Sequence, residues 1–143
     1  MSIINSYFDK VYVLNLKSRP SRLDLMSRKL RLFDIDFESV DAIPGKALSG
    51  VLSNFKHNHF FSNPNYLGSN LSHLSIYAES LELGYNNILI LEDDLRIHRH
   101  LESIFTDCVN NDIIIKSKDY DLLYLSFIPV EEDGHRWDYN IIN

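Results

Sequence analysis

Residues 87–94 read Asn-Ile-Leu-Ile-Leu-Glu-Asp-Asp. Four consecutive apolar residues without alternation are typical of a strand buried on both faces, as in a parallel sheet covered by helices. This strand is followed directly by three carboxylates, Glu92, Asp93 and Asp94. Because open α/β sheets bind ligands beyond the carboxyl ends of their strands, the stretch indicates both a fold class and a candidate site.

The rest of the chain alternates between strand and helix patterns. Apolar, β-branched runs predict strands, and apolar residues that recur every three or four positions predict helices. Strands are predicted at residues 10–16, 35–40, 87–91 and 120–127, and helices at 20–32, 69–83 and 99–109. This alternation indicates an α/β fold with a mostly parallel sheet.

Two of the predicted helices carry an apolar stripe that we expect to face the core. The stripes consist of Leu23, Met26, Leu30 and Phe33 in the first helix and of Leu71, Leu74, Ala78 and Leu81 in the second. Between these helices, residues 42–66 contain Pro, Gly and Asn at positions that break any period. We therefore expect a long loop there, of the kind that is usually functional or mobile.

Length and composition limit the class of protein. The chain has 143 residues, 45% of them apolar and 24% charged, which predicts one globular domain over residues 1–143. No apolar run approaches the roughly 20 residues that a membrane span needs, and the first ten residues lack the features of a signal peptide. We expect a chain without a transmembrane segment, cytoplasmic or peripheral to a membrane.

The charge is unevenly distributed. The formal net charge of −6 argues against a general nucleic-acid binder. Residues 1–31 nevertheless hold seven basic and two acidic side chains. Such a basic segment suits a small anionic ligand, or it forms a solvated helix face.

The acidic triplet is the strongest candidate for chemistry. Adjacent carboxylates repel one another, and a bound Mg²⁺ or Mn²⁺ would remove that repulsion while sharing its shell with substrate phosphates. Alternate residues of a strand face the same side, so Glu92 and Asp94 are the predicted metal ligands and Asp93 is expected on the other side. The alternative is a solvated acidic turn.

Two further segments combine a helix start with polar side chains. Residues 15–22 read Asn-Leu-Lys-Ser-Arg-Pro-Ser-Arg, where a phosphate could bind backbone N–H groups and meet Arg19 and Arg22. Residues 68–73 read Gly-Ser-Asn-Leu-Ser-His, and the glycine permits a close backbone approach. The alternatives are exposed arginines at a structural helix start, and a histidine with only a structural hydrogen bond.

Taken in order, residues 11–22, 37–42, 68–73 and 88–95 resemble glycosyltransferase family 25. This is the family of lipooligosaccharide galactosyltransferases and of the collagen hydroxylysine galactosyltransferase domains. The resemblance runs from about residue 9 to residue 127 and implies a GT-A-like, Rossmann-like nucleotide-diphosphosugar fold. It also implies a UDP-sugar donor, galactose or glucose, a saccharide or protein hydroxyl acceptor, and a divalent cation, usually manganese.

The resemblance also assigns residues to roles. Its acidic metal motif matches the triplet, with Glu92 and Asp94 expected to hold Mn²⁺ or Mg²⁺. The residues expected to bind the donor are Asn15, Arg19, Arg22, Asp41, Ser72, His73 and Asp93. No catalytic residue is assigned.

One departure from the family bears on activity. Family domains usually continue well past the strand equivalent to residues 120–127, whereas sixteen residues follow Phe127 here. We expect a donor-binding half at about 9–127, a short tail at 128–143, and slow turnover unless a homo-oligomer completes the acceptor pocket.

Two alternatives to a metal-dependent hexosyltransferase remain. One is a catalytically degenerate domain that binds a nucleotide sugar or a partner chain. The other is a Mg²⁺-dependent phospho-receiver, which the pattern favours least because its acidic pair would lie on the first strand, and here that strand ends at Asn15.

Overall fold

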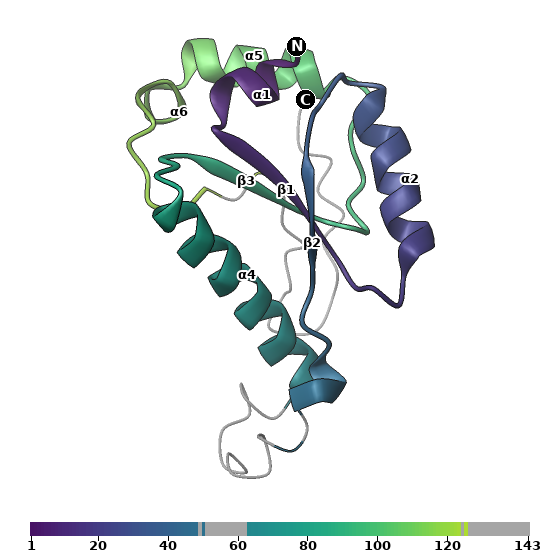
Figure 1. Cartoon of the computed structure of the whole chain (residues 1–143). Coiled ribbons are helices and arrows are strands. Elements are labelled where there is room, and N and C mark those ends of the chain that lie inside the picture. Colours follow the sequence, from purple (N-terminus) through teal and green to yellow (C-terminus); the bar gives the residue numbers. More distant parts are fainter. Residues whose placement is uncertain (49, 51–62, 124, 126–143) are drawn as a thin grey trace, which may run out of the picture.

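A three-stranded parallel sheet with the order β2-β1-β3 lies at the centre of the protein (Figure 1). The structure is a computed structural model that describes residues 1–48, 50, 63–123 and 125. The strands are β1 (Lys10–Asn15), β2 (Glu38–Asp41) and β3 (Ile88–Glu92). The helices are α1 (Ile3–Tyr7), α2 (Pro20–Arg31), α4 (Pro64–Glu82), α5 (Leu101–Asn111) and α6 (Ile113–Ser117), with a 3₁₀ turn η1 (Gly45–Leu48). The prediction of an α/β fold with parallel strands is confirmed.

The central strand β1 sets the register of the sheet. Asn15 is paired with Asp41 of β2, and Leu14 is paired with Glu92 of β3. All three strands run in the same direction, so they end together, at Asn15, Asp41 and Glu92. We call this the carboxyl-terminal edge of the sheet, and the opposite side, where the strands begin, the amino-terminal edge.

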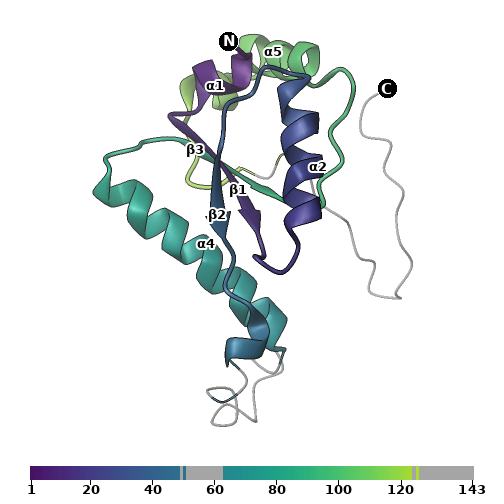
Figure 2. The same ribbon diagram turned by 45° about the vertical axis from the view of Figure 1, so that its right-hand side comes forward.

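Helices cover both faces of the sheet, with α2 and α4 on opposite sides (Figures 1 and 2). Val11 and Val13 of β1 belong to the larger core, which is formed mainly by α1, α2 and α5. Tyr12 and Leu14 point the other way and pack against Ile76 of α4. Both faces of β1 are thus covered, which explains why residues 11–14 are all apolar instead of alternating with polar residues.

The apolar stripe predicted for α2 is confirmed, because its four residues all pack in the larger core, with Met26 and Leu30 fully buried. The stripe predicted for α4 is wrong, because Leu74 and Leu81 are 57% and 78% exposed.

The face of α4 that is buried consists of small residues and one isoleucine, namely Gly68, Ser72, Ile76 and Ser80. A Cβ atom on Gly68 would lie 2.5 Å from the carbonyl oxygen of Ile43. The close approach of two backbones, rather than hydrophobicity, therefore selects the buried face of this helix.

Two elements, β2 and α4, begin at residues other than those predicted. The strand predicted at 35–40 begins only at Glu38, because Ile35 donates its N–H to the carbonyl of Leu30 and belongs to the turn that ends α2. Helix α4 begins at Pro64 rather than near residue 69, with Asn63 as an N-cap whose side chain accepts from the N–H of Asn65.

Two predicted loop or strand segments also differ from the structure. The predicted loop 42–66 contains η1 and the first turn of α4, while its residues 49 and 51–62 lie outside the described residues. The predicted strand 120–127 is wrong for residues 120–123, which form no strand. There the hydroxyl of Tyr120 is instead bound to Tyr7 and Asn87; of the remaining positions only residue 125, also outside any strand, is described.

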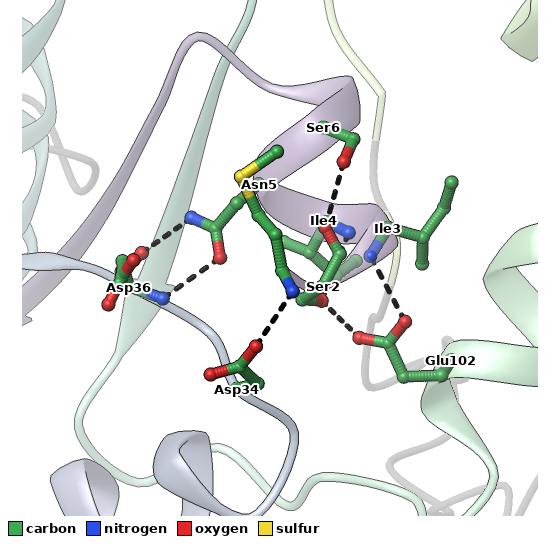
Figure 3. A network of polar contacts seen from close by, with 9 residues as sticks. Ser2, Ile3, Ile4, Asn5, Ser6, Asp34, Asp36 and Glu102 are labelled. Carbon is green, nitrogen blue, oxygen red and sulfur yellow. Dashed lines mark hydrogen bonds and ion pairs between the residues drawn. The ribbon is translucent and has the colours of Figure 1, made fainter.

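Polar contacts hold α1, which we did not predict, against the ends of other elements (Figure 3). The hydroxyl of Ser2 and the N–H of Ile3 both donate to the carboxylate of Glu102 in α5. The side chain of Asn5 exchanges two hydrogen bonds with the backbone of Asp36.

Among the described helices, none is both long enough and apolar enough to cross a membrane.

Candidate functional site

A cleft of about 330 Å³ opens at the carboxyl-terminal edge of the sheet. It lies between the segments that follow β1 and β2, the first turns of α4 and the end of β3. Its lining residues are Leu14, Leu16, Arg19, Arg22, Ala42, Ile43, Gly45, Asn65, Ser69, Glu92, Asp93 and Asp94. Five of the nine residues that the sequence singled out therefore line one cavity: Arg19, Arg22, Glu92, Asp93 and Asp94.

Arg22 of α2 binds two of the three carboxylates. Its Nη1 atom lies 3.1 Å from Oδ1 of Asp93 and 3.2 Å from Oδ2 of Asp94. The hydrogen bond to Asp93 is the main reason why the pKa of Arg22 is raised above its usual value. The side chain of Asp93 is only 11% exposed, and Arg22 is the cation that lies against it.

The expected division of the acidic triplet is not the one observed. Strand β3 ends at Glu92, and Asp93 and Asp94 form a turn, so the alternation of strand side chains does not reach Asp94. Asp93 and Asp94 both contact Arg22, whereas Glu92 pairs with His73 of α4. The triplet is thus divided between α2 and α4.

The pair formed by Glu92 and His73 connects the end of β3 to α4. Oε1 of Glu92 lies 3.5 Å from Nε2 of His73. The hydrogen bond to His73 lowers the pKa of Glu92, against the opposing effect of partial burial. His73 is not among the lining residues, so it acts on the cleft through Glu92.

Asn15, at the end of β1, has an unsatisfied buried acceptor. The residue is 5% exposed, and its Nδ2 atom donates to the carbonyl of Leu16. Its Oδ1 atom has no hydrogen-bond partner among the described residues. Leaving a buried acceptor unpaired costs about 1–3 kcal/mol, so a ligand or water that donates to Oδ1 would recover that cost.

Two other predicted residues lie beside the cleft without lining it. Asp41 is exposed and forms an ion pair with Lys17 at 2.9 Å. Ser72 is fully buried; its hydroxyl donates to the carbonyl of Gly68 and accepts from the N–H of Ile43. Ser72 therefore holds Ile43, which forms part of the cleft wall.

The wall made by η1 and the start of α4 contributes Gly45, Asn65 and Ser69 to the lining. The sequence indicated only the part around Ser69, which belongs to the candidate segment 68–73. A Cβ atom on Gly45 would lie 2.4 Å from the carbonyl oxygen of Pro64. Gly45 also packs against Gly68. Both glycines are visible in the sequence as loop and helix-start residues, but no local pattern indicates that they contact each other.

The described residues supply some, but not all, of the ligand atoms that a divalent cation needs. Among the described residues, no group of three or more His, Cys, Asp or Glu side chains is arranged to hold a metal ion. Oxygens of Asp93 and Asp94 do converge on a single positively charged atom, Nη1 of Arg22. Mg²⁺ and similar cations are often held by one or two carboxylates and completed by phosphates and water, and this pair of carboxylates fits that arrangement.

Comparison with known proteins gives the family. Residues 8–131 match glycosyltransferase family 25, described as LPS biosynthesis protein. The chain is 34% identical to procollagen galactosyltransferase 1-B of Xenopus laevis over 82% of its own length and 21% of that protein. It is 31% identical to inactive glycosyltransferase 25 family member 3 of Mus musculus, again over 82% of the chain and 22% of the relative.

A human relative, procollagen galactosyltransferase 2, is 29% identical over 82% of the chain and 20% of its own length. The chain therefore spans about a fifth of the length of these curated relatives. No solved structure matches the chain. With most of its length matched to one family, and with the cleft at the edge where such sheets bind ligands, the chain belongs to glycosyltransferase family 25.

Proposed function

We propose that the cleft binds a nucleoside-diphosphate sugar together with a divalent cation, and that the chain is the donor-binding part of a glycosyltransferase. The observation that carries this proposal is the convergence of Asp93 and Asp94 on one point, beside two arginines, in a cleft at the carboxyl-terminal edge. The donor is UDP-galactose or UDP-glucose, and the fold is GT-A-like, with which three parallel strands are compatible.

The charges of the lining favour a cation and a diphosphate over either one alone. The lining contains two arginines and three carboxylates, a formal excess of one negative charge. A diphosphate would therefore enter a site of its own sign. A divalent cation reverses that sign, and Arg19 and Arg22 then add donors that suit phosphate oxygens.

The side chains divide the work of binding. Asp94 and Asp93 hold Mn²⁺ or Mg²⁺, with Glu92 next to them in the lining. When bound, the cation supplies neutralisation of the charge that develops on the departing diphosphate. Asn15 is buried at the end of β1 and does not itself line the cleft, so a water molecule between it and the donor would satisfy its unpaired Oδ1 atom.

Thermal stability with added ligands tests the proposal. A ligand that binds only the folded chain raises its Tm. We expect UDP, UDP-galactose or UDP-glucose to raise the Tm when Mn²⁺ is present and to have little effect in its absence, and GDP-sugars to be weaker. The variant Asp94→Asn should lose the Mn²⁺-dependent shift. No shift with any nucleotide, or equal shifts with and without Mn²⁺, would contradict the proposal.

A second candidate function is donor binding without transfer. It is favoured by the mouse relative, which is described as inactive and is about as similar to this chain as relatives described as galactosyltransferases. A UDP-release assay with saccharide and hydroxyl-bearing peptide acceptors separates the two. Acceptor-dependent release supports the transferase, whereas nucleotide binding without release supports the binding domain.

A further inference from the structure

Arg22 has two possible partners: the carboxylates of Asp93 and Asp94, and the diphosphate of the proposed donor. The proposed function places its guanidinium on the diphosphate of the donor. In the structure, the same guanidinium instead neutralises Asp93 and Asp94, the two carboxylates that would hold the cation. Nη1 cannot lie between these carboxylates while a cation occupies the same position.

We propose that Arg22 is an exchangeable substitute for the divalent cation: it occupies the oxygens of Asp93 and Asp94 in the chain alone, and a binding cation displaces it toward the diphosphate. The inference rests on the proposed function. It adds that the cation displaces Arg22 before the arginine binds the diphosphate, and that the binding of cation and nucleotide is coupled. Cation and arginine compete for the carboxylates, and the displaced arginine then serves the nucleotide.

The geometry makes the competition direct. Both contacts to the carboxylates come from Nη1, at 3.1 Å and 3.2 Å. A cation such as Mg²⁺ sits about 2.0–2.1 Å from its oxygen ligands, so one that bound both oxygens would lie where this nitrogen now lies. Repulsion between the cation and the guanidinium would drive the side chain away.

Arg22 is free to move without rearrangement of the fold. Its side chain is 40% exposed, and within the described part of the chain its Nε and Nη2 atoms make no hydrogen bond. The helix that carries it stays attached through buried Met26 and Leu30 and through Lys29, whose Nζ donates to the carbonyl of Leu95 at 3.1 Å. Rotation of one side chain is therefore sufficient.

The exchange predicts that cation and nucleotide bind with positive coupling. A cation that binds alone must displace Arg22 into solvent, which weakens its affinity. A cation that binds with a diphosphate gives the displaced guanidinium a new partner. By linkage, each ligand then raises the affinity of the other by the same factor.

The test measures binding of Mn²⁺ alone, from the electron paramagnetic resonance signal of the free ion. The variant Arg22→Gln removes the competing cation, so we expect it to bind Mn²⁺ about threefold to tenfold more tightly than the parent chain. Arg19→Gln is the matched control, because Arg19 lines the same cleft and, among the described ion pairs, the carboxylates pair with Arg22 and His73 rather than with Arg19. Arg28→Gln, paired with Asp24 on the outer side of α2, controls for net charge.

A second experiment measures UDP binding at saturating Mn²⁺, where we expect Arg22→Gln to have the opposite effect on affinity. Here Arg22→Gln should weaken UDP binding about tenfold, because the diphosphate loses a charged donor. Unchanged or weaker Mn²⁺ binding in Arg22→Gln would overturn the exchange, as would an equal gain in Arg19→Gln. If the parent chain still binds UDP with Mn²⁺, that result leaves the proposed function standing. Absence of both Mn²⁺ and UDP binding in every chain would overturn the exchange and the function together.

Discussion

The carboxylates at the two edges of the sheet have different kinds of partner. At the amino-terminal edge, the carboxylate of Asp9 accepts from the N–H groups of Asn86 and Asn87 at 2.7 Å and 2.9 Å. The hydroxyls of Tyr7 and Tyr120 likewise bind each other there. At the carboxyl-terminal edge, by contrast, the carboxylates of Asp93 and Asp94 share one nitrogen of Arg22. Among the described residues, two buried side-chain atoms lack a hydrogen-bond partner: Oδ1 of Asn15 at this edge and Oγ of Ser80 in α4.

Under the proposed function, this difference separates polar groups that stabilise the fold from polar groups that bind the donor and its cation. Satisfied networks contribute to stability, and each buried group that is left unpaired subtracts from it. The α1 contacts in Figure 3 belong to the first kind. We expect changes at the amino-terminal edge to act on unfolding, and changes at the carboxyl-terminal edge to act mainly on ligand binding.

The largest effect is expected from Phe105→Ala, at the amino-terminal side of the larger core. Phe105 is 4% exposed, and its ring packs on Tyr7 and Phe8 with centroid distances of 5.2 Å and 5.8 Å. Its truncation should lower the free energy of unfolding by about 3–5 kcal/mol. Denaturant unfolding measures this loss, while UDP affinity of the folded fraction should not change. A loss below 1 kcal/mol would contradict the assignment of this core.

Gly68→Ala tests whether the carboxyl-terminal edge also contains rigid packing. The new methyl group would meet the carbonyl of Ile43 at 2.5 Å, so the helix must shift, at a cost of about 1–3 kcal/mol. Asn70→Ala, at an exposed position on the same helix, is the control and should stay within about 0.5 kcal/mol. Equal stability of the two variants would show that α4 does not require this close approach.

A matched pair of carboxylate-to-amide changes compares the two edges directly. Asp9→Asn weakens an acceptor of two backbone N–H groups and should cost about 1 kcal/mol of stability with no effect on nucleotide binding. Asp94→Asn should change stability less and remove Mn²⁺-dependent binding. Chemical denaturation and UDP titration of both variants check the pair. If Asp9→Asn instead removed nucleotide binding and Asp94→Asn mainly lowered stability, the proposed difference between the two edges would be wrong.

The smallest effect concerns pH. The pKa of Glu92 is lowered from its ordinary value of 4.5 by the hydrogen bond to His73, so Glu92 stabilises the fold above that pH. The contribution is lost as pH falls through the lower folded value. Parent and Glu92→Gln chains should therefore differ by less than about 1 kcal/mol at pH 6 and converge in acid, since Glu92 is 58% exposed and solvent weakens its interaction with His73. A difference that persists at pH 3, or that survives His73→Ala, would contradict this pairing.

The sequence predicted the parts of the fold that depend on local patterns. Strand β1 and the position of β3 follow from continuous apolar runs, the buried stripe of α2 follows from apolar periodicity, and the carboxylates at the end of β3 indicated the site. The expectation that β3 is buried on both faces is wrong, because its residues are half-buried or exposed and it lies at an edge of the described sheet. The buried face of α4 could not be predicted, because it depends on Gly68 meeting a distant backbone rather than on the leucines of the helix.

The partners of the three carboxylates could not be predicted either, because they too depend on residues distant in the sequence. Strand alternation holds only to Glu92, and the turn that follows directs Asp93 and Asp94 to the same arginine of α2. Asn15 was expected from a resemblance, whereas its unpaired oxygen is visible only in three dimensions.

The most direct test of a ligand site at the carboxyl-terminal edge is a calorimetric titration of UDP into the full chain, with and without Mn²⁺. We expect one saturable site that requires Mn²⁺, that is lost in Asp94→Asn and that is retained in Asp9→Asn. UDP binding that persists unchanged without Mn²⁺, or in Asp94→Asn, would contradict a cation-dependent donor site in this cleft.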